Sequence, residues 1–236
     1  HIPKSSSNEV EQAVSAADLA RKNWAKLSLE KRAIWLDRIA DNLESKSEEI
    51  ASLESLDTGK PISLARAVDA SRSISNFRFF AEFARDYSDE KFETEDAINH
   101  VVRKPVGIAG LITPWNLPLY LLSWKIAPAI VMGNTVVAKP SELTPLTANL
   151  LAEVIHEVGL PAGVVNIIHG LGSETGQAIV ENPKVNIISF TGGTATGRKV
   201  AETAAPMFKK LSLELGGKNA TIVLEDTNLE KVIPDI

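Results

Sequence analysis

The sequence VNIISFTGGTATGRKVAETAAPMFKKLSLELGG, residues 185–217, alternates between two kinds of segment. Its two ends are short runs rich in apolar and β-branched residues, and the 14 residues 194–207 between them have the length of a helix. The same alternation reaches back to residue 106, with apolar runs at 106–113, 134–140 and 163–170. Strands that alternate with helices are typical of a parallel sheet covered on both faces. The sequence therefore predicts an α/β fold.

The first 87 residues follow a different pattern. Three segments, residues 5–27, 28–61 and 61–87, carry apolar residues at helical spacing, and Gly59 with Pro61 ends the second. Residues 88–106 fit neither pattern and are expected to be extended. The predicted fold is thus a Rossmann-like parallel sheet with helices on both faces, preceded by N-terminal helices.

Composition excludes several classes of function. The chain has 236 residues, a net charge of −5 and no Lys/Arg block, which argues against a nucleic-acid partner or a membrane surface. Its longest apolar run, IAPAIVMG, is far shorter than the roughly 20 residues of a membrane span. Zero cysteines exclude a thiol nucleophile within these residues, and the four histidines show no metal-binding spacing. We expect a cytoplasmic protein without a metal site.

Two predicted strands run into glycine-rich turns, IIHGLGSETGQAI (167–179) and ISFTGGTATGRKV (188–200). The first is one residue longer than a dinucleotide fingerprint, and a plain tight turn explains either loop equally well. The second resembles a phosphate-binding P-loop, but Arg198 and Lys199 stand where that motif needs Lys and Ser/Thr. These two departures exclude an ATPase.

Three polar positions stand out at the predicted strand ends. Asn116 lies between Pro114 and Pro118 and is either a turn residue or an oxyanion donor held in a rigid frame. Glu214 alternates with leucines, and this places it either on a solvent face or in a cleft at the strand end. Lys139 and Glu142 are three residues apart, which fits two ribose hydroxyls, although spacing alone favours a solvated loop.

Together, the motifs ITPWNLPLYLLSWKIAPAIVMGNTVVAKPSE (112–142), FTGG (190–193) and LELGGKN (213–219) resemble the NAD-dependent aldehyde dehydrogenase superfamily. The resemblance runs from the first helices to residue 236, in the order of the family, and implies an aldehyde dehydrogenase fold that is incomplete here. The segment NFRFFA (76–81) resembles sequences of the branch of the superfamily that acts on 2-aminomuconic and 2-hydroxymuconic semialdehydes.

The resemblance also implies a set of site residues. Asn116 would be the oxyanion donor and Glu214 the general base. Lys139 and Glu142 would hold the adenosine ribose, and Gly193, where the family usually has Ser, would approach the pyrophosphate. The expected NAD-binding residues are Ile112, Thr113, Pro114, Trp115, Lys139, Ser141, Glu142, Gly172, Gly176, Thr191, Gly192, Gly193, Leu215 and Gly216.

The mechanism that the resemblance implies is covalent. A thiolate adds to the aldehyde, Asn116 stabilises the oxyanion, hydride passes to the nicotinamide, and Glu214 activates water against the thioester. The family places its cysteine a few dozen residues after the LELGGK motif, so we expect it beyond residue 236 and expect this chain alone to be inactive. We expect the sequence to be a fragment, because it has no initiator Met and stops where a predicted helix begins.

The family pattern further implies an organisation into domains. Residues 1–87 and 107–216 would form the NAD-binding domain, residues 88–106 part of an oligomerisation arm for a homodimer or homotetramer, and residues 217–236 the start of a catalytic domain. Arg72 is a candidate anchor for a substrate carboxylate, although a solvated arginine paired with Asp69 explains it equally well.

Two other functions remain open at the level of the sequence. One is a non-catalytic relative that keeps the fold for a binding or structural role. The other is an acylating relative that passes its thioester to coenzyme A. Glu214 argues against the second, because such enzymes have less need of a base that activates water.

Overall fold

The computed structural model describes residues 2–218 and 220–233. Its centre is a five-stranded parallel sheet with strand order β5-β4-β3-β6-β7. The strands are β3 (Ile108–Ile112), β4 (Thr135–Lys139), β5 (Val165–Ile167), β6 (Val185–Thr191) and β7 (Lys210–Glu214). Each falls within a run that the sequence predicted, so the parallel sheet is confirmed.

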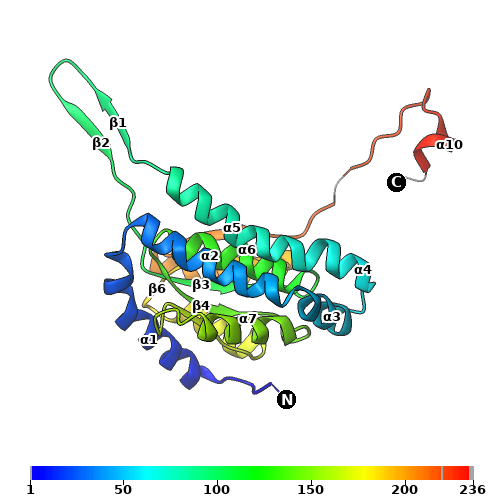
Figure 1. The fold of residues 1–236 in the computed structure, drawn as a ribbon, viewed down its shortest axis with the longest axis horizontal. Helices are drawn as coiled ribbons and strands as arrows, with labels where there is room; N and C mark the ends of the chain where they lie inside the picture. The colour runs from blue at the N-terminus through cyan, green and yellow to red at the C-terminus, as the bar shows by residue number, and fades with distance from the viewer. Residues whose placement is uncertain (1, 219, 234–236) are drawn as a thin grey trace.

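Helices precede the sheet and connect its strands (Figure 1). The N-terminal group comprises α1 (Ser7–Ala25), α2 (Leu29–Ser45), α3 (Ser47–Thr58), α4 (Ile62–Leu64), the π-helical η1 (Ala65–Ala70) and α5 (Ser71–Asp86). The connecting and C-terminal group comprises α6 (Pro118–Val131), α7 (Leu146–Glu157), η2 (Gly172–Gly176), α8 (Gln177–Glu181), α9 (Thr194–Ala204), η3 (Ala205–Met207) and α10 (Leu229–Val232). The second predicted helical segment is in fact two helices, which break at Lys46.

Alternate residues of the central strands face two separate cores. Ala109 and Leu111 of β3 pack into a core with residues of α2, α3, α5, α6 and α7. Ile108 and Ile112 of the same strand pack into the other core, with residues of α1, α8 and α9. This period of two is the signature of a strand, and apolar residues at both phases place β3 in the interior of the molecule.

Strand β7 departs from the prediction of a sheet covered on both faces. It is an edge strand of the described sheet, and its side chains alternate between half-buried Leu211 and Leu213 and exposed Ser212 and Glu214. One face of β7 is therefore open here, because both side chains on it are exposed.

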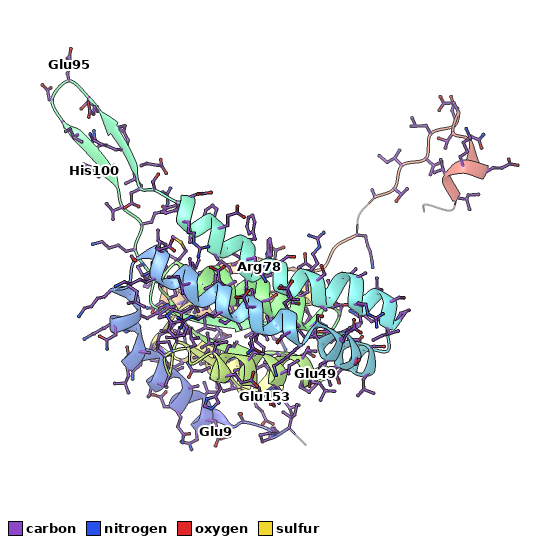
Figure 2. The ribbon with its side chains drawn as sticks, viewed as in Figure 1. Glu9, Glu49, Arg78, Glu95, His100 and Glu153 are labelled. Atoms are coloured by element: carbon purple, nitrogen blue, oxygen red, sulfur yellow. The ribbon has the colours of Figure 1, made fainter. Side chains whose placement is uncertain are left out.

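Residues 88–106 project from the body as an antiparallel hairpin of β1 (Glu90–Glu93) and β2 (Ile98–Val101) (Figure 1). Figure 2 shows Glu95 at its tip and His100 along β2. The described residues after Gly216 also lead away from the body, while residues 219 and 234–236 of the expected catalytic segment lie outside the described range.

The described part of the chain has neither a membrane-spanning helix nor a cluster of metal ligands. None of its helices combines the length and the apolar character needed to cross a membrane. No group of three or more His, Cys, Asp or Glu side chains within it is placed to hold a metal ion.

Candidate functional site

The carboxyl ends of the central strands meet along one edge of the sheet. Ile112 is the register partner of both Lys139 on β4 and Phe190 on β6, and Thr191 is the partner of Glu214 on β7. Backbone hydrogen bonds continue past the strand ends, from the N–H of Thr113 to the carbonyl of Lys139. Four of the strand ends predicted to carry site residues thus lie side by side.

The strand order reverses at this edge, between β3 and β6. From β3 the chain moves outward through β4 and β5, then returns to the other side of β3 for β6 and β7. A cavity of about 400 Å³ lies there, and we call it the switch-point cavity. Its lining includes Ile112, Gly172, Gly176, Phe190, Thr196 and Lys199. In open α/β sheets, ligands bind in the crevice at such a reversal.

Lys139 and Glu142 form an ion pair beside this cavity. The Lys139 ammonium is buried and lies 2.5 Å from Oε2 of Glu142, while Oε1 of Glu142 accepts a hydrogen bond from the N–H of Gly172 at 3.4 Å. Partial burial opposes ionisation of Glu142, but these hydrogen bonds and the Lys139 charge outweigh it and lower the pKa of the carboxyl. Lys139 is therefore buried and not the solvated charge that spacing alone favoured, while Glu142 stays exposed to solvent.

The N-terminus of α9 faces open space at Gly193. Gly193 is the N-cap of this helix, the helix has no side-chain cap, and a Cβ built on Gly193 meets no atom within 4 Å. A Cβ on Gly192 would instead lie 2.5 Å from the ring of Phe190. Uncapped N–H groups at a helix N-terminus are suited to bind phosphate, and here they come with room for the ligand.

Leu215 and Gly216 pack against the same helix. A Cβ on Gly197 would lie 2.3 Å from Cδ2 of Leu215, and one on Gly216 would lie 3.3 Å from Oγ1 of Thr194. Ser141 is buried and its hydroxyl accepts a hydrogen bond from the N–H of Leu143. Leu215, Gly216 and Ser141 thus lie next to the strand ends that carry the other predicted site residues.

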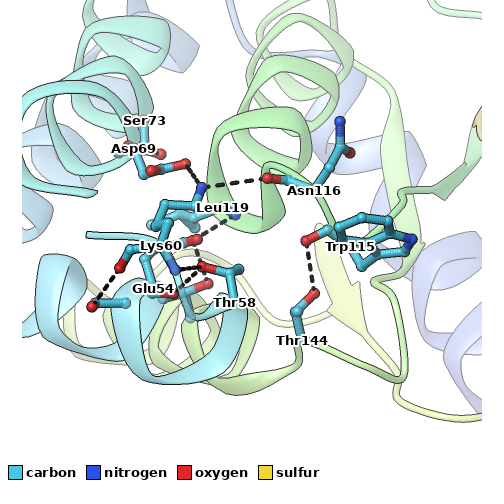
Figure 3. A network of polar contacts seen from close by, with 11 residues as sticks. Glu54, Thr58, Lys60, Asp69, Ser73, Trp115, Asn116, Leu119 and Thr144 are labelled. Carbon is cyan, nitrogen blue, oxygen red and sulfur yellow. Dashed lines mark hydrogen bonds and ion pairs between the residues drawn. The ribbon is translucent and has the colours of Figure 1, made fainter. Parts of the chain in front are cut away.

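Asn116 lies on an exposed loop between β3 and α6. Its backbone carbonyl accepts a hydrogen bond from the Lys60 ammonium at 3.3 Å, while its carboxamide points away from this contact (Figure 3). Among the described residues the carboxamide makes no hydrogen bond, so the turn role for this side chain is not what the structure shows. The neighbouring Trp115 is 58% exposed, and its carbonyl faces the hydroxyl of Thr144 at 3.5 Å.

Glu214 lines a second cavity of about 400 Å³, on the α6 side of the sheet, which we call the Glu214 cavity. Lys125, Ser189 and Ser212 also line it, and the Lys125 ammonium donates to Oγ of Ser189 at 2.6 Å. Burial lowers the pKa of Lys125 to about 8, although the charge of Glu214 acts in the opposite direction.

Sequence reasoning did not select Lys125 or Ser189. The available signal was a lysine in the middle of the apolar segment LLSWKIAPAIV, where a buried charge needs a partner.

Arg72 lies on α5 and is exposed. The structure contradicts its pairing with Asp69, since Asp69 is fully buried and bonded to Lys60. Neither of the two cavities has Arg72 or Asn116 in its lining.

A doubly wound parallel sheet, with a cavity at its switch point and an open helix N-terminus beside it, defines an α/β protein of the nucleotide-binding type. The family assignment is more specific, because the aldehyde dehydrogenase family model matches residues 1–236. The chain belongs to the aldehyde dehydrogenase family.

The chain is 50% identical to bovine (Bos taurus) 2-aminomuconic semialdehyde dehydrogenase over 236 residues, which cover 99% of this chain and 48% of that protein. It is 49% identical to 2-hydroxymuconic semialdehyde dehydrogenase of Pseudomonas sp. strain CF600 over 232 residues, 95% of this chain and 48% of the relative. The chain therefore spans about half the length of the curated relatives it matches.

Solved structures agree with this fold. Aldehyde dehydrogenase C of Pseudomonas syringae, solved as a cysteine-to-alanine variant with NAD+ and octanal, superposes with a TM-score of 0.93 at 39% identity over 100% of this chain and 48% of that one. An NAD+ complex of a Bacillus cereus aldehyde dehydrogenase gives a TM-score of 0.94 at 38% identity, over 98% of this chain and 48% of that one. The prediction of an aldehyde dehydrogenase fold is confirmed.

Proposed function

We propose that this chain is the cofactor-binding part of an enzyme that oxidises an aldehyde to the carboxylic acid with NAD. The observation that carries the proposal is the switch-point cavity. It opens at the sheet edge where β7 ends at Glu214 and where β3 ends before the segment that carries Asn116. Relatives at 49–50% identity that bear the names of semialdehyde dehydrogenases support it.

The residues at the sheet edge fit NAD. Glycines with open Cβ space at positions 172 and 193 allow a close approach of the ligand to the backbone, and the uncapped start of α9 offers N–H groups to a pyrophosphate. Lys139 and Glu142 would hold the adenosine ribose, with the backbone of residues 112–115 along the cofactor. When bound, NAD supplies an acceptor for the hydride of the aldehyde.

The two proposed catalytic residues complement each other. The Asn116 carboxamide donates hydrogen bonds without titrating, which suits a developing oxyanion and is worth about 3–4 kcal/mol. Glu214 is exposed at the end of β7, next to a cavity, and can take a proton from an attacking water. The nucleophile is a cysteine thiol, which we place in sequence that follows Ile236.

A carboxylate-bearing semialdehyde is the proposed substrate class. The relatives named for muconic semialdehydes support it, and Arg72 on the exposed face of α5 would pair with the substrate carboxylate. We further propose that residues 1–87 and 107–216 act as the NAD-binding domain and that residues 217–236 begin the catalytic domain.

The hairpin of residues 88–106 is proposed to join subunits of a homodimer or homotetramer. It projects from the body, and apolar side chains of both strands, Phe92 and Ile98 among them, are more than half exposed (Figure 1). Light scattering on the intact protein and on a variant with this hairpin shortened tests the assignment, and a monomeric intact protein contradicts it.

The function itself is tested on the complete reading frame that contains these residues. NADH formation with a semialdehyde, lowered at least 100-fold by Asn116→Ala, is the expected result. The rival is a non-catalytic relative, and it would bind NAD without turning over any aldehyde. An acylating enzyme would instead require coenzyme A for turnover.

A further inference from the structure

A buried polar network lies behind the Asn116 loop, which we define as residues 113–119. Glu54 on α3 and Asp69 on η1 are both fully buried carboxylates, and the ammonium of Lys60 lies 2.8 Å from Oδ1 of Asp69 (Figure 3). The same ammonium donates to the backbone carbonyl of Asn116 at 3.3 Å. One cation thus connects the N-terminal helices to the residue that carries the candidate oxyanion donor.

Lys60 is held in place by its own backbone. Gly59 ends α3 in the left-handed conformation, with φ of 76°, and Pro61 follows directly after Lys60. The carbonyl of Lys60 accepts a hydrogen bond from the hydroxyl of Ser55 at 2.7 Å, and its N–H donates to Oγ1 of Thr58. These contacts fix the point from which the side chain reaches Asp69 and Asn116.

Glu54 holds the other end of the loop. Helix α6 begins at Pro118 without a side-chain cap of its own, so the N–H of Leu119 needs an acceptor from elsewhere. Oε1 of Glu54 accepts that hydrogen bond at 3.0 Å and a second from the hydroxyl of Thr147 at 2.8 Å. A carboxylate at this position also complements the positive end of the helix dipole.

The network contains buried charges that depend on the position of the Lys60 ammonium. Oε2 of Glu54 and Oδ2 of Asp69 are buried and have no hydrogen-bond partner among the described residues, and burial, with a smaller effect of the Asp69 charge, raises the pKa of Glu54. Lys60 forms the ion pair with Asp69, and its charge also acts, more weakly, in favour of the ionised form of Glu54. A displacement of its ammonium would leave buried charge unpaired, which is strongly unfavourable.

We propose that Lys60, Asp69 and Glu54 are positioning residues that hold the Asn116 loop from behind, so that the Asn116 carboxamide stays aimed at the reacting oxygen. The inference rests on the proposed function, in which Asn116 stabilises an oxyanion. Lys60 acts at the backbone carbonyl of Asn116, and Glu54 acts three residues later, at Leu119. Between these two contacts the chain has little freedom, because Pro118 also fixes its own φ.

A double-mutant cycle on the intact enzyme tests this. Asp69→Asn removes the charge that holds Lys60 with little change in shape, and we expect kcat/KM for the aldehyde to fall about tenfold, since a displacement near 1 Å costs up to about 100-fold. The Kd for NAD should change less than twofold. In the Asn116→Ala background the same substitution should cost less than twofold, because residues that act through one group are not additive.

The matched control is Asp57→Asn. Asp57 lies on the same helix as Glu54 and accepts a hydrogen bond from the N–H of Leu146 at 2.9 Å at the start of α7. Among the described residues it makes no hydrogen bond to Lys60 or Asn116, so it performs the same kind of contact without touching either of them. This variant should keep kcat/KM within about twofold. Lys60→Arg should recover most of the kcat/KM that Lys60→Met loses, because it retains the charge and the donors.

The outcomes distinguish the proposed function from the positioning role of Lys60, Asp69 and Glu54. If Asn116→Ala leaves turnover unchanged, the proposed function fails at its oxyanion donor. If Asn116→Ala is slow but Asp69→Asn costs its full tenfold in that background too, the positioning role is overturned and the proposed function stands. Should Asp69→Asn not fold, the same cycle with Lys60→Met decides, since methionine removes the ammonium that contacts the backbone carbonyl of Asn116.

Discussion

The ammonium of Lys139 and the carboxylate of Glu142 lie 2.5 Å apart at the carboxyl end of β4, and the carboxylate also accepts from the N–H of Gly172. A fixed negative charge at this place would accept a hydrogen bond from a ribose 2′-hydroxyl and repel a 2′-phosphate. We therefore predict that the intact protein binds NAD at least tenfold more tightly than NADP.

Two substitutions separate charge from hydrogen bonding in this prediction. Glu142→Gln keeps an acceptor but removes the repulsion, so the preference should shrink mainly through tighter NADP binding. Glu142→Ala should also weaken NAD. The measurement is the Kd of both cofactors by calorimetry, and equal binding of NAD and NADP by the wild type would rule out the assignment.

The same ion pair predicts a pH window. The folded-state pKa of Glu142 is lowered below its ordinary value of 4.5. A carboxyl of this kind contributes stability that is present above the unfolded pKa and is lost as the pH falls through the lower folded pKa. Glu142 therefore stays ionised above pH 6, and the 2′-phosphate of NADP, with a second pKa of about 6, is fully charged only above about pH 7. Discrimination against NADP should hence be constant from pH 7 to 8, and a loss of preference within that range would contradict an ionised Glu142.

Glu214→Gln should separate the two halves of the reaction. If Glu214 activates water, its loss slows hydrolysis of the thioester by about 100-fold or more while the first oxidation still occurs. Rapid mixing should then show a stoichiometric burst of NADH followed by slow turnover. Ser212→Ala, on the same face of β7, is the control and should turn over normally. A variant without a burst would place Glu214 in the first step instead.

Gly193→Ser should strengthen NAD binding. The structure has room for a Cβ at this position, and a serine there would add a hydroxyl at the N-cap of α9 that can donate to a phosphate. One such hydrogen bond to a charged group predicts a Kd about 10- to 100-fold lower. Gly192→Ser is the contrasting variant, because its Cβ would collide with Phe190, and it should lose stability instead. Weaker NAD binding by Gly193→Ser would argue against the pyrophosphate position.

Lys209 predicts an alkaline gain in stability. Burial lowers its pKa from 10.5 to about 8, and its ammonium donates to the carbonyl of Asn182. Between pH 8 and 10.5 the unfolded state binds more protons than the folded state, so stability from this group rises with pH. Relative to Lys209→Met, the wild type should gain about 1–4 °C in Tm between pH 7 and 10. Lys209→Arg does not titrate in this range and should behave as Lys209→Met does.

The sheet could be predicted from the sequence because its central strands, β3 and β4, are buried on both faces. Such strands read as short apolar runs between helix-length segments, and β3 to β7 lie where those runs lie. The break at Lys46 could not be predicted, since amphipathic helical spacing continues on both sides of it. The sequence left open whether Glu214 lies on a solvent face or in a cleft, because edge position depends on strand order, which a local pattern does not encode.

The site was predictable only in part for a similar reason. Motif residues at strand ends, such as Lys139 and Glu214, are brought to one edge by the parallel register. Lys60 and Glu54 read as surface charges of a helix and its end, and their importance rests on contacts to Asn116 and Leu119, 56 and 65 residues away. Such contacts follow from tertiary packing alone.

Arg72 gives the prediction that bears most directly on substrate choice. Its side chain makes no ion pair with any described residue, and Asp69, the partner that its spacing suggested, is occupied by Lys60. An exposed guanidinium on α5 is thus available to a carboxylate, which it can bind in a bidentate manner.

Arg72→Ala should lower kcat/KM for a semialdehyde with a distal carboxylate by about 10- to 100-fold, the value of a hydrogen bond to a charged group. A neutral aldehyde of equal length should lose less than threefold, and Arg78→Ala, whose side chain pairs with Asp41 and Glu44, should affect neither substrate. Equal losses for the acidic and the neutral aldehyde would remove the special role of Arg72, because the substitution would then act on the helix and not on the substrate carboxylate.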